Sequence, residues 1–248
     1  MSEGAYFLYH SIGLYPGKAE EMAAAFAAFS RSWGADDDAQ WPSVLAGRAE
    51  FLELWQGLVG ASEGSLTSAE NVTTALYSVI GALPEARLRG KRVLVAADCF
   101  PSLHFLLSGL GERLGFTLET VPLRAGEDWV REEDMIARWG PDVGLALLTF
   151  VTSTASYRAD LAALTAHARA MGSLVALDVT QGIGILPFDL AEARPDIVVG
   201  SSLKWLCGTP GAGVLWVDPA LLPECRPELR GWFSQPDPFN WDLDAFAY

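Results

Sequence analysis

The sequence predicts an α/β fold of three layers, in which helices cover both faces of a mostly parallel sheet. Three observations support this prediction. The chain has 248 residues, of which 50% are hydrophobic, and that is enough for one large packed domain. From residue 65 onward, short apolar segments alternate with segments of helical periodicity, as βαβ units do. The apolar run at 143–151 (VGLALLTFV) is continuous rather than alternating, which is typical of a strand buried on both faces.

The individual elements follow in order along the chain. The apolar segment at 6–16 is broken by Gly13 and Pro16, which predicts an extended arm. The segment at 18–33 is rich in Ala and acidic in its first turn, which favours a helix. After a predicted loop at 36–42, apolar residues at helical spacing predict a second helix at 44–59. Strands are then predicted at 65–68, 92–96, 116–121, 143–150, 173–178, 196–200 and 213–217, with helices at 72–83, 101–114, 131–138 and 160–171.

The end of the sheet and the tail differ from this pattern. The last strand, at 213–217, follows a Gly-rich turn and is predicted to be antiparallel. Residues 219–238 are Pro-rich, which predicts irregular structure.

Charge and composition exclude several functional classes. The chain has 17 Lys and Arg against 31 Asp and Glu, a formal net charge of −14. Such a chain repels nucleic acid and anionic membranes, so we expect neither as a partner. Its longest apolar run is far below the roughly 20 residues that span a bilayer, and no signal peptide is visible. We therefore expect a cytoplasmic protein. The three cysteines have no metal-ligand spacing, which predicts reduced thiols and no metal site.

A lysine and an aspartate follow two of the predicted strands. Asp178 ends the strand at 173–178, and Lys204 comes shortly after the strand at 196–200. Functional side chains of an open α/β sheet gather beyond the carboxyl ends of its strands, so we expect these two at the same edge. Pyridoxal phosphate (PLP) requires such a pair, with the lysine holding the aldehyde as a Schiff base and the carboxylate keeping the ring nitrogen protonated. The alternatives are a surface lysine and an aspartate that caps a turn.

The segment SSLKWLCGTPGAG at 201–213 resembles the S-x-x-K-W/Y-L-x-G-x-x-G-x-G pattern of the class V aminotransferase group, and several motifs are most like kynureninase. The resemblance implies the large domain of a fold-type I PLP-dependent enzyme over residues 1–248, with an N-terminal arm at 1–17 and a small C-terminal domain largely absent. It implies that Lys204 is the Schiff-base lysine and the general acid and base at Cα. Asp178 would stabilise negative charge through the protonated ring.

The same resemblance implies further cofactor contacts. Gln181, in D-x-x-Q, would reach the ring hydroxyl or the imine side, and Phe100 would stack on the ring. Val72 and Thr73 open a predicted helix and would bind the phosphate with free N–H groups, with Ser201 as a second donor. The alternatives are N-capping and a core phenylalanine.

Two more residues match the group less specifically. Thr149 matches a serine that faces the cofactor. Trp232 resembles a tryptophan that reaches the phosphate region, often from the partner subunit, and a core or interface aromatic is the alternative. Ser68 is another candidate phosphate donor.

The expected function is a PLP-dependent enzyme with a small-molecule amino-acid substrate, and a kynureninase-like hydrolase is the first hypothesis. Leu103, Gln181 and Leu203 stand where kynureninases carry aspartate, histidine and tyrosine, so a class V aminotransferase or a desulfurase or epimerase relative is an alternative. A catalytically incomplete PLP-binding protein is an alternative of another class. The resemblance also implies a homodimer.

Overall fold

A seven-stranded sheet forms the centre of the computed structural model, which describes residues 5–235 and 237–244. The strand order is β1-β7-β6-β5-β4-β2-β3. The adjacent strands in the part β6-β5-β4-β2-β3 are parallel, whereas β7 is antiparallel to both of its neighbours, β6 and β1. The strands are β1 (Leu66–Ala69), β2 (Arg92–Ala96), β3 (Thr117–Val121), β4 (Val143–Thr149), β5 (Leu174–Asp178), β6 (Ile197–Ser201) and β7 (Gly213–Val217).

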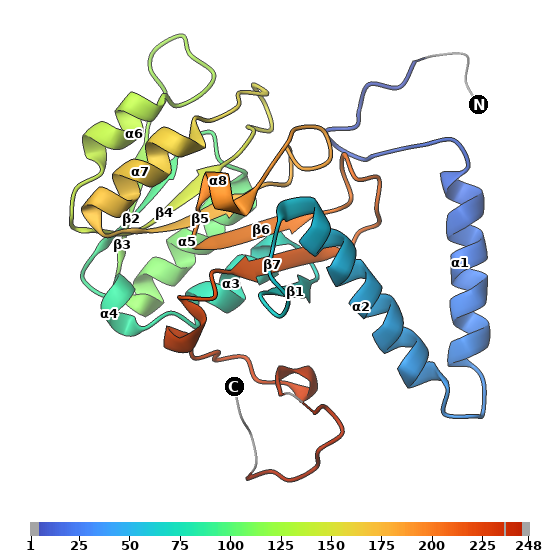
Figure 1. The fold of residues 1–248 in the computed structure, drawn as a ribbon. Helices are drawn as coiled ribbons and strands as arrows, with labels where there is room; N and C mark the ends of the chain where they lie inside the picture. The colour runs from blue at the N-terminus through green and yellow to red at the C-terminus, as the bar shows by residue number, and fades with distance from the viewer. Residues whose placement is uncertain (1–4, 236, 245–248) are drawn as a thin grey trace.

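Helices cover both faces of this sheet (Figure 1). One face packs against α3 (Val72–Ile80), α4 (Glu85–Leu88) and α5 (Pro101–Leu114). The other packs against α6 (Glu132–Arg138), α7 (Leu161–Met171), α8 (Leu190–Ala193) and the end of α2 (Gln40–Val59). The predicted three-layer arrangement with a mostly parallel sheet is therefore the one that the chain adopts.

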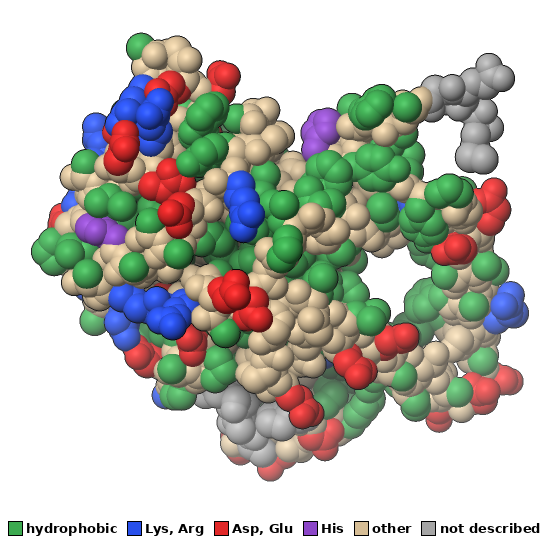
Figure 2. Space-filling model, turned by 45° about the horizontal axis from the view of Figure 1, so that its top comes forward, with side chains coloured by type: hydrophobic (Ala, Val, Ile, Leu, Met, Phe, Trp, Pro, Cys, Tyr) green, Lys and Arg blue, Asp and Glu red, His purple; other side chains and the backbone are tan. Residues whose placement is uncertain are grey.

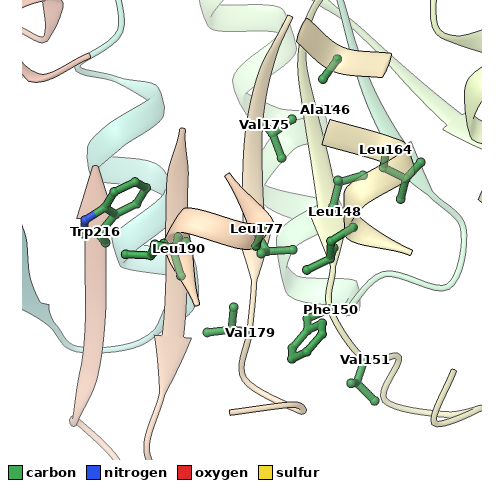
Figure 3. Close-up of a cluster of buried hydrophobic side chains, with 14 of the residues drawn as sticks. Ala146, Leu148, Phe150, Val151, Leu164, Val175, Leu177, Val179, Leu190 and Trp216 are labelled. Atoms are coloured by element: carbon green, nitrogen blue, oxygen red, sulfur yellow. The ribbon is translucent and has the colours of Figure 1, made fainter. Parts of the chain in front are cut away.

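The buried strands contribute side chains to two hydrophobic cores, one on each face of the sheet. In β4, Leu145 and Leu147 belong to the core under α3 and α5, while Ala146 and Leu148 belong to the opposite core. Successive side chains of a strand point to opposite faces, so a continuous apolar run serves both layers. Figure 3 shows side chains of β4, β5 and β7 in the second core, together with Leu164 of α7.

The predicted element boundaries agree with the structure to within one residue, with a few exceptions. The helix predicted at 44–59 begins at Gln40, because Pro42 lies in its first turn, where its missing N–H is not needed. The helix predicted at 72–83 ends at Ile80, before Gly81. The four-residue helices α4 and α8 were not predicted, and two short 3-10 helices, Leu222–Glu224 and Trp232–Ser234, interrupt the irregular tail.

The first helix, α1 (Lys18–Trp33), stands apart from the sheet. None of its residues is buried, and Figure 2 shows an opening between it and the rest of the molecule. The arm before it connects it to the loops beyond β5 and β6 (Figure 1). None of the helices in the described part of the chain combines the length and apolar character that a membrane crossing requires.

Candidate functional site

A cavity of about 490 Å³ lies beyond the carboxyl ends of β5 and β6. Its walls come from the ends of these two strands and the loops that follow them, the loop after β4, the beginnings of α3 and α5, and the N-terminal arm. All but two of the predicted site residues line it, namely Val72, Thr73, Phe100, Asp178, Gln181, Ser201 and Lys204. The other lining residues are His10, Ser11, Asn71, Ser102, Ser153, Thr180 and Leu203.

Asp178 lies at the floor of this cavity because the buried strand β5 ends there. The residue is only 5% exposed. Its Oδ1 accepts hydrogen bonds from the Thr180 N–H at 2.9 Å and from the Thr180 hydroxyl at 2.6 Å. Burial raises the pKa of Asp178, whereas the two Thr180 hydrogen bonds and the Lys204 charge act in the opposite direction. The site therefore contains a buried acid whose charge is only partly compensated.

Lys204 is half-buried three residues after the end of β6. Burial lowers the pKa of this lysine, and the Asp178 carboxylate acts against that shift. Its Nζ lies 5.2 Å from the centre of the Phe100 ring, a favourable position for a cation over an aromatic face. Phe100 is 38% exposed, so its ring is open to the cavity rather than enclosed in a core. Amine, carboxylate and ring thus surround one space.

The beginnings of α3 and α5 meet at the edge of this space. Asn71 caps α3, since its Oδ1 accepts from the Thr74 N–H at 3.0 Å and its own N–H donates to the Thr74 hydroxyl at 3.2 Å. The first N–H groups of a helix have no partner within it, which leaves those of Val72 and Thr73 for an anion. The Thr73 hydroxyl donates to the Ser102 hydroxyl at 3.0 Å and thereby connects the two helix starts.

Three neighbours fix the side-chain amide of Gln181. The Trp205 indole N–H donates to Oε1 at 3.0 Å. The NH2 group donates to the His10 carbonyl at 3.0 Å and to the Ser153 hydroxyl at 3.4 Å. The orientation of the amide is therefore set by the loop after β6, the loop after β4 and the arm.

Two of the predicted site residues do not line this cavity. Thr149 pairs with Asp178 in the sheet, and it lines a separate cavity of about 30 Å³ near Asp98. Trp232 lies in the C-terminal segment, where its ring is 4.9 Å from that of Trp41. The alternative phosphate donor Ser68 accepts a hydrogen bond from Arg48 at 3.1 Å.

Sequence reasoning missed several lining residues. Thr180 follows Asp178 by two positions and Ser102 follows Phe100 by two, so their closeness to predicted residues was a usable signal. Ser153 gave no comparable signal, because its loop is placed by tertiary contacts. Among the described residues, no group of three or more His, Cys, Asp and Glu side chains is placed to hold a metal ion.

Comparison with known proteins gives matches over most of the chain. The model of a family described as aminotransferase class-V matches residues 56–235. The kynureninase of Pseudomonas fluorescens is 29% identical over 246 residues, which cover 94% of this chain and 56% of that protein. The kynureninase of Deinococcus radiodurans is 31% identical over 186 residues, covering 74% and 43%. The chain thus spans about half the length of the curated relatives it matches.

Solved structures match the fold. The cystine C-S lyase C-DES, in complex with cysteine persulfide, superposes with a TM-score of 0.83 at 22% identity, covering 94% of this chain and 62% of that one. The apo cysteine desulfurase from Thermococcus onnurineus NA1 gives 0.79 at 17% identity, covering 99% and 60%. Identities this low carry information on the fold alone, and they confirm the predicted fold class, the large domain of a fold-type I enzyme.

Proposed function

Because the chain belongs to the aminotransferase class-V family, we propose that it binds PLP in the Lys204 cavity and acts there on an amino acid. One observation carries this proposal. A half-buried lysine and a buried carboxylate share the cavity with an open aromatic face, and burial shifts the pKa of each ionisable group toward its neutral form. Groups perturbed in this way, gathered in one cavity, are typical of a catalytic site.

The residues present fit the chemistry of the cofactor. Lys204 would carry the PLP aldehyde on Nζ, and Phe100 would lie against the ring. The N–H groups at the start of α3, together with the Ser201 hydroxyl, would bind the phosphate. When bound, PLP supplies an electron sink that stabilises negative charge at the substrate Cα.

Asp178 would face the ring nitrogen. Both hydrogen bonds from Thr180 end on Oδ1 of Asp178, which leaves Oδ2 as the oxygen that a ring N–H can approach. A cation at that place would compensate the buried charge of Asp178 and lower its pKa toward the ordinary value. Gln181 would orient the ring from the side of the arm.

Lys204 would also move the proton at the substrate Cα. A lysine acts as nucleophile and as base only when it is neutral. Because burial lowers the pKa of Lys204, a larger fraction of its amine is neutral near pH 7 than in an exposed lysine. The same Nζ would then accept a proton and return it, as a general base and acid do.

For the reaction itself, we propose kynureninase-like hydrolysis as the first activity to test, since kynureninases are among the matched relatives. Hydrolytic cleavage between Cβ and Cγ of L-kynurenine would release alanine. A class V aminotransferase would instead produce a 2-oxo acid, and a desulfurase would release sulfur from cysteine. Assay of these products separates the candidates.

A second candidate is a protein that binds PLP without turnover. No arginine is among the lining residues of the cavity, so the described residues supply no guanidinium in the cavity for a substrate carboxylate. This observation favours binding of the cofactor without efficient capture of an amino acid.

Uptake of PLP by the purified chain tests the proposal. We expect a visible absorption band that borohydride fixes to the protein and that Lys204→Ala abolishes. Lys91→Ala is the matched control, because Lys91 precedes β2 at the opposite end of the strands. A wild-type chain that takes up no PLP would contradict the proposal. A band that responds to amino acids while no product forms would favour the second candidate.

A further inference from the structure

The N-terminal arm, residues 5–17, crosses the turn that carries Lys204. The Gly13 N–H donates to the Leu203 carbonyl at 3.0 Å. A Cβ at position 13 would lie 1.8 Å from the Lys204 carbonyl oxygen and 2.7 Å from the Cys207 Cα. The backbone of the arm therefore rests directly on the turn, and the contact requires glycine at position 13.

Lys18 connects the arm to the other end of the same turn. This residue begins α1, and its Nζ donates to the Gly13 carbonyl at 2.7 Å and to the Gly208 carbonyl at 3.1 Å. Gly208 closes the turn, since its N–H donates to the Ser202 carbonyl at 2.7 Å. One ammonium group thus joins two segments that are far apart in the sequence, through two charge-assisted hydrogen bonds.

The turn itself has a backbone conformation that needs support. Cys207 has a φ of 58°, in the left-handed region, which strains a non-glycine residue and persists only where the surroundings fix it. Part of that support comes from the arm, because the Cys207 Sγ lies 3.7 Å from the Leu14 carbonyl oxygen. The Tyr9 ring also stacks on Trp205, with centroids 5.9 Å apart and planes 9° apart.

We infer that Lys18 is a positioning residue for Lys204: by holding the arm on the turn, it fixes the backbone from which the Lys204 amine meets the cofactor. This inference rests on the proposed binding of PLP. Lys18 does not line the Lys204 cavity, so it acts through the turn and not by contact with the ligand. A turn that is already ordered loses less conformational entropy when the ligand binds. The two Lys18 hydrogen bonds therefore raise the affinity for PLP.

The coupling between arm and cofactor must be reciprocal. If a docked arm strengthens PLP binding, bound PLP holds the arm down by the same factor. His10 and Ser11 line the cavity, and the His10 carbonyl accepts a hydrogen bond from the Gln181 amide. A ligand in the cavity would therefore contact the arm directly. Cleavage at Tyr6 or Tyr9 by chymotrypsin therefore reports on docking.

The test compares PLP binding by absorbance among variants of the full chain. Lys18→Met removes both charge-assisted hydrogen bonds, and we expect it to weaken PLP binding at least tenfold, since the loss of either bond alone corresponds to about that factor. Lys18→Arg should restore most of the affinity, because a guanidinium can also donate to two carbonyls. Lys91→Met should bind as the wild type does. Melting temperatures recorded in parallel separate loss of positioning from loss of fold.

A second pair of variants tests the same contact from the arm side. Gly13→Ala should weaken PLP binding at least as much as Lys18→Met, whereas Gly57→Ala, with no atom within 4 Å of the added Cβ, should not. In the wild type, PLP should slow chymotryptic cleavage of the arm, and Lys18→Met should remove this protection.

Each outcome decides one question. If the wild type binds PLP and Lys18→Met binds it equally well with a protected arm, the positioning role is wrong while the proposed function stands. If the wild type shows no PLP band, the proposed function fails and this inference fails with it.

Discussion

Thr180 donates two hydrogen bonds that favour the charged form of the buried Asp178, and this arrangement can be tested by removing one of them. Thr180→Val deletes the hydroxyl that donates at 2.6 Å and preserves the shape of the side chain, while the backbone N–H bond at 2.9 Å stays. A hydrogen bond to a charged group contributes about 1.5–3 kcal/mol. Since Asp178 is only 5% exposed, little water can reach the place of the lost donor, and most of the effect should be seen.

The sign of the pH dependence follows from the pKa of Asp178. Burial raises this pKa above the ordinary value of 3.8. A carboxyl whose pKa is raised by folding stabilises the fold when protonated, and that contribution is lost as the pH rises through the folded pKa. Thr180→Val raises the pKa further. The variant should therefore lose about 1.5–3 kcal/mol of unfolding free energy near pH 8, and less as the pH falls toward 3.8.

Urea unfolding of the PLP-free protein at several pH values measures this effect. Thr165→Val is the matched control, because its buried hydroxyl donates at 2.8 Å to a neutral acceptor, the Leu161 carbonyl. Its loss of stability should not depend on pH. An equal pH-independent loss in both variants would refute the link between the Thr180 hydroxyl and the charge of Asp178.

Further predictions concern the walls of the cavity and the packing below it. Phe100→Leu should weaken PLP binding several-fold in an absorbance titration, because it removes an aromatic face worth about 0.5–1.5 kcal/mol. Phe105→Leu is the control: the Phe105 ring, in α5, is 71% exposed, and its loss should have no effect. Gly182→Ala should lower the free energy of unfolding by about 1–3 kcal/mol, since the new Cβ would lie 2.3 Å from the Phe150 ring. Gly47→Ala, in α2 with no atom within 4 Å of the added Cβ, should raise it by up to about 1 kcal/mol in the same denaturation experiment.

Much of the fold could be predicted because local patterns and tertiary structure agree. The strand Arg92–Ala96 and the helix Pro101–Leu114 have the bounds that the sequence predicts, since apolar runs and Pro at a helix start carry their own signals. The start of α2 could not be predicted in the same way. The sequence predicts a loop that includes Pro42, and only the structure shows that Pro42 occupies the first turn of the helix.

The site could be predicted only where it follows from strand ends. Asp178 and Lys204 follow neighbouring parallel strands, so topology alone brings them to one edge. The contact of Lys18 with Gly208 joins distant parts of the chain, and no local pattern contains it. The resemblance also implies that Thr149 and Trp232 lie at the cofactor, but neither residue lines the cavity. Thr149 ends β4 and Trp232 lies in the C-terminal segment.

The antiparallel strand β7 also governs the order in which the molecule can assemble. Leu66 of β1 pairs with Trp216 of β7, so β1, which is synthesised before the other strands of this sheet, can pair only after β7 has been synthesised. Pairings between such distant segments form slowly, because a long loop must close first. The loop that contains Lys204 joins β6 to β7 and is completed in the same event. During synthesis, the sheet from β3 to β6 can therefore form early, and we expect the Lys204 cavity to be the last part of the domain to take shape.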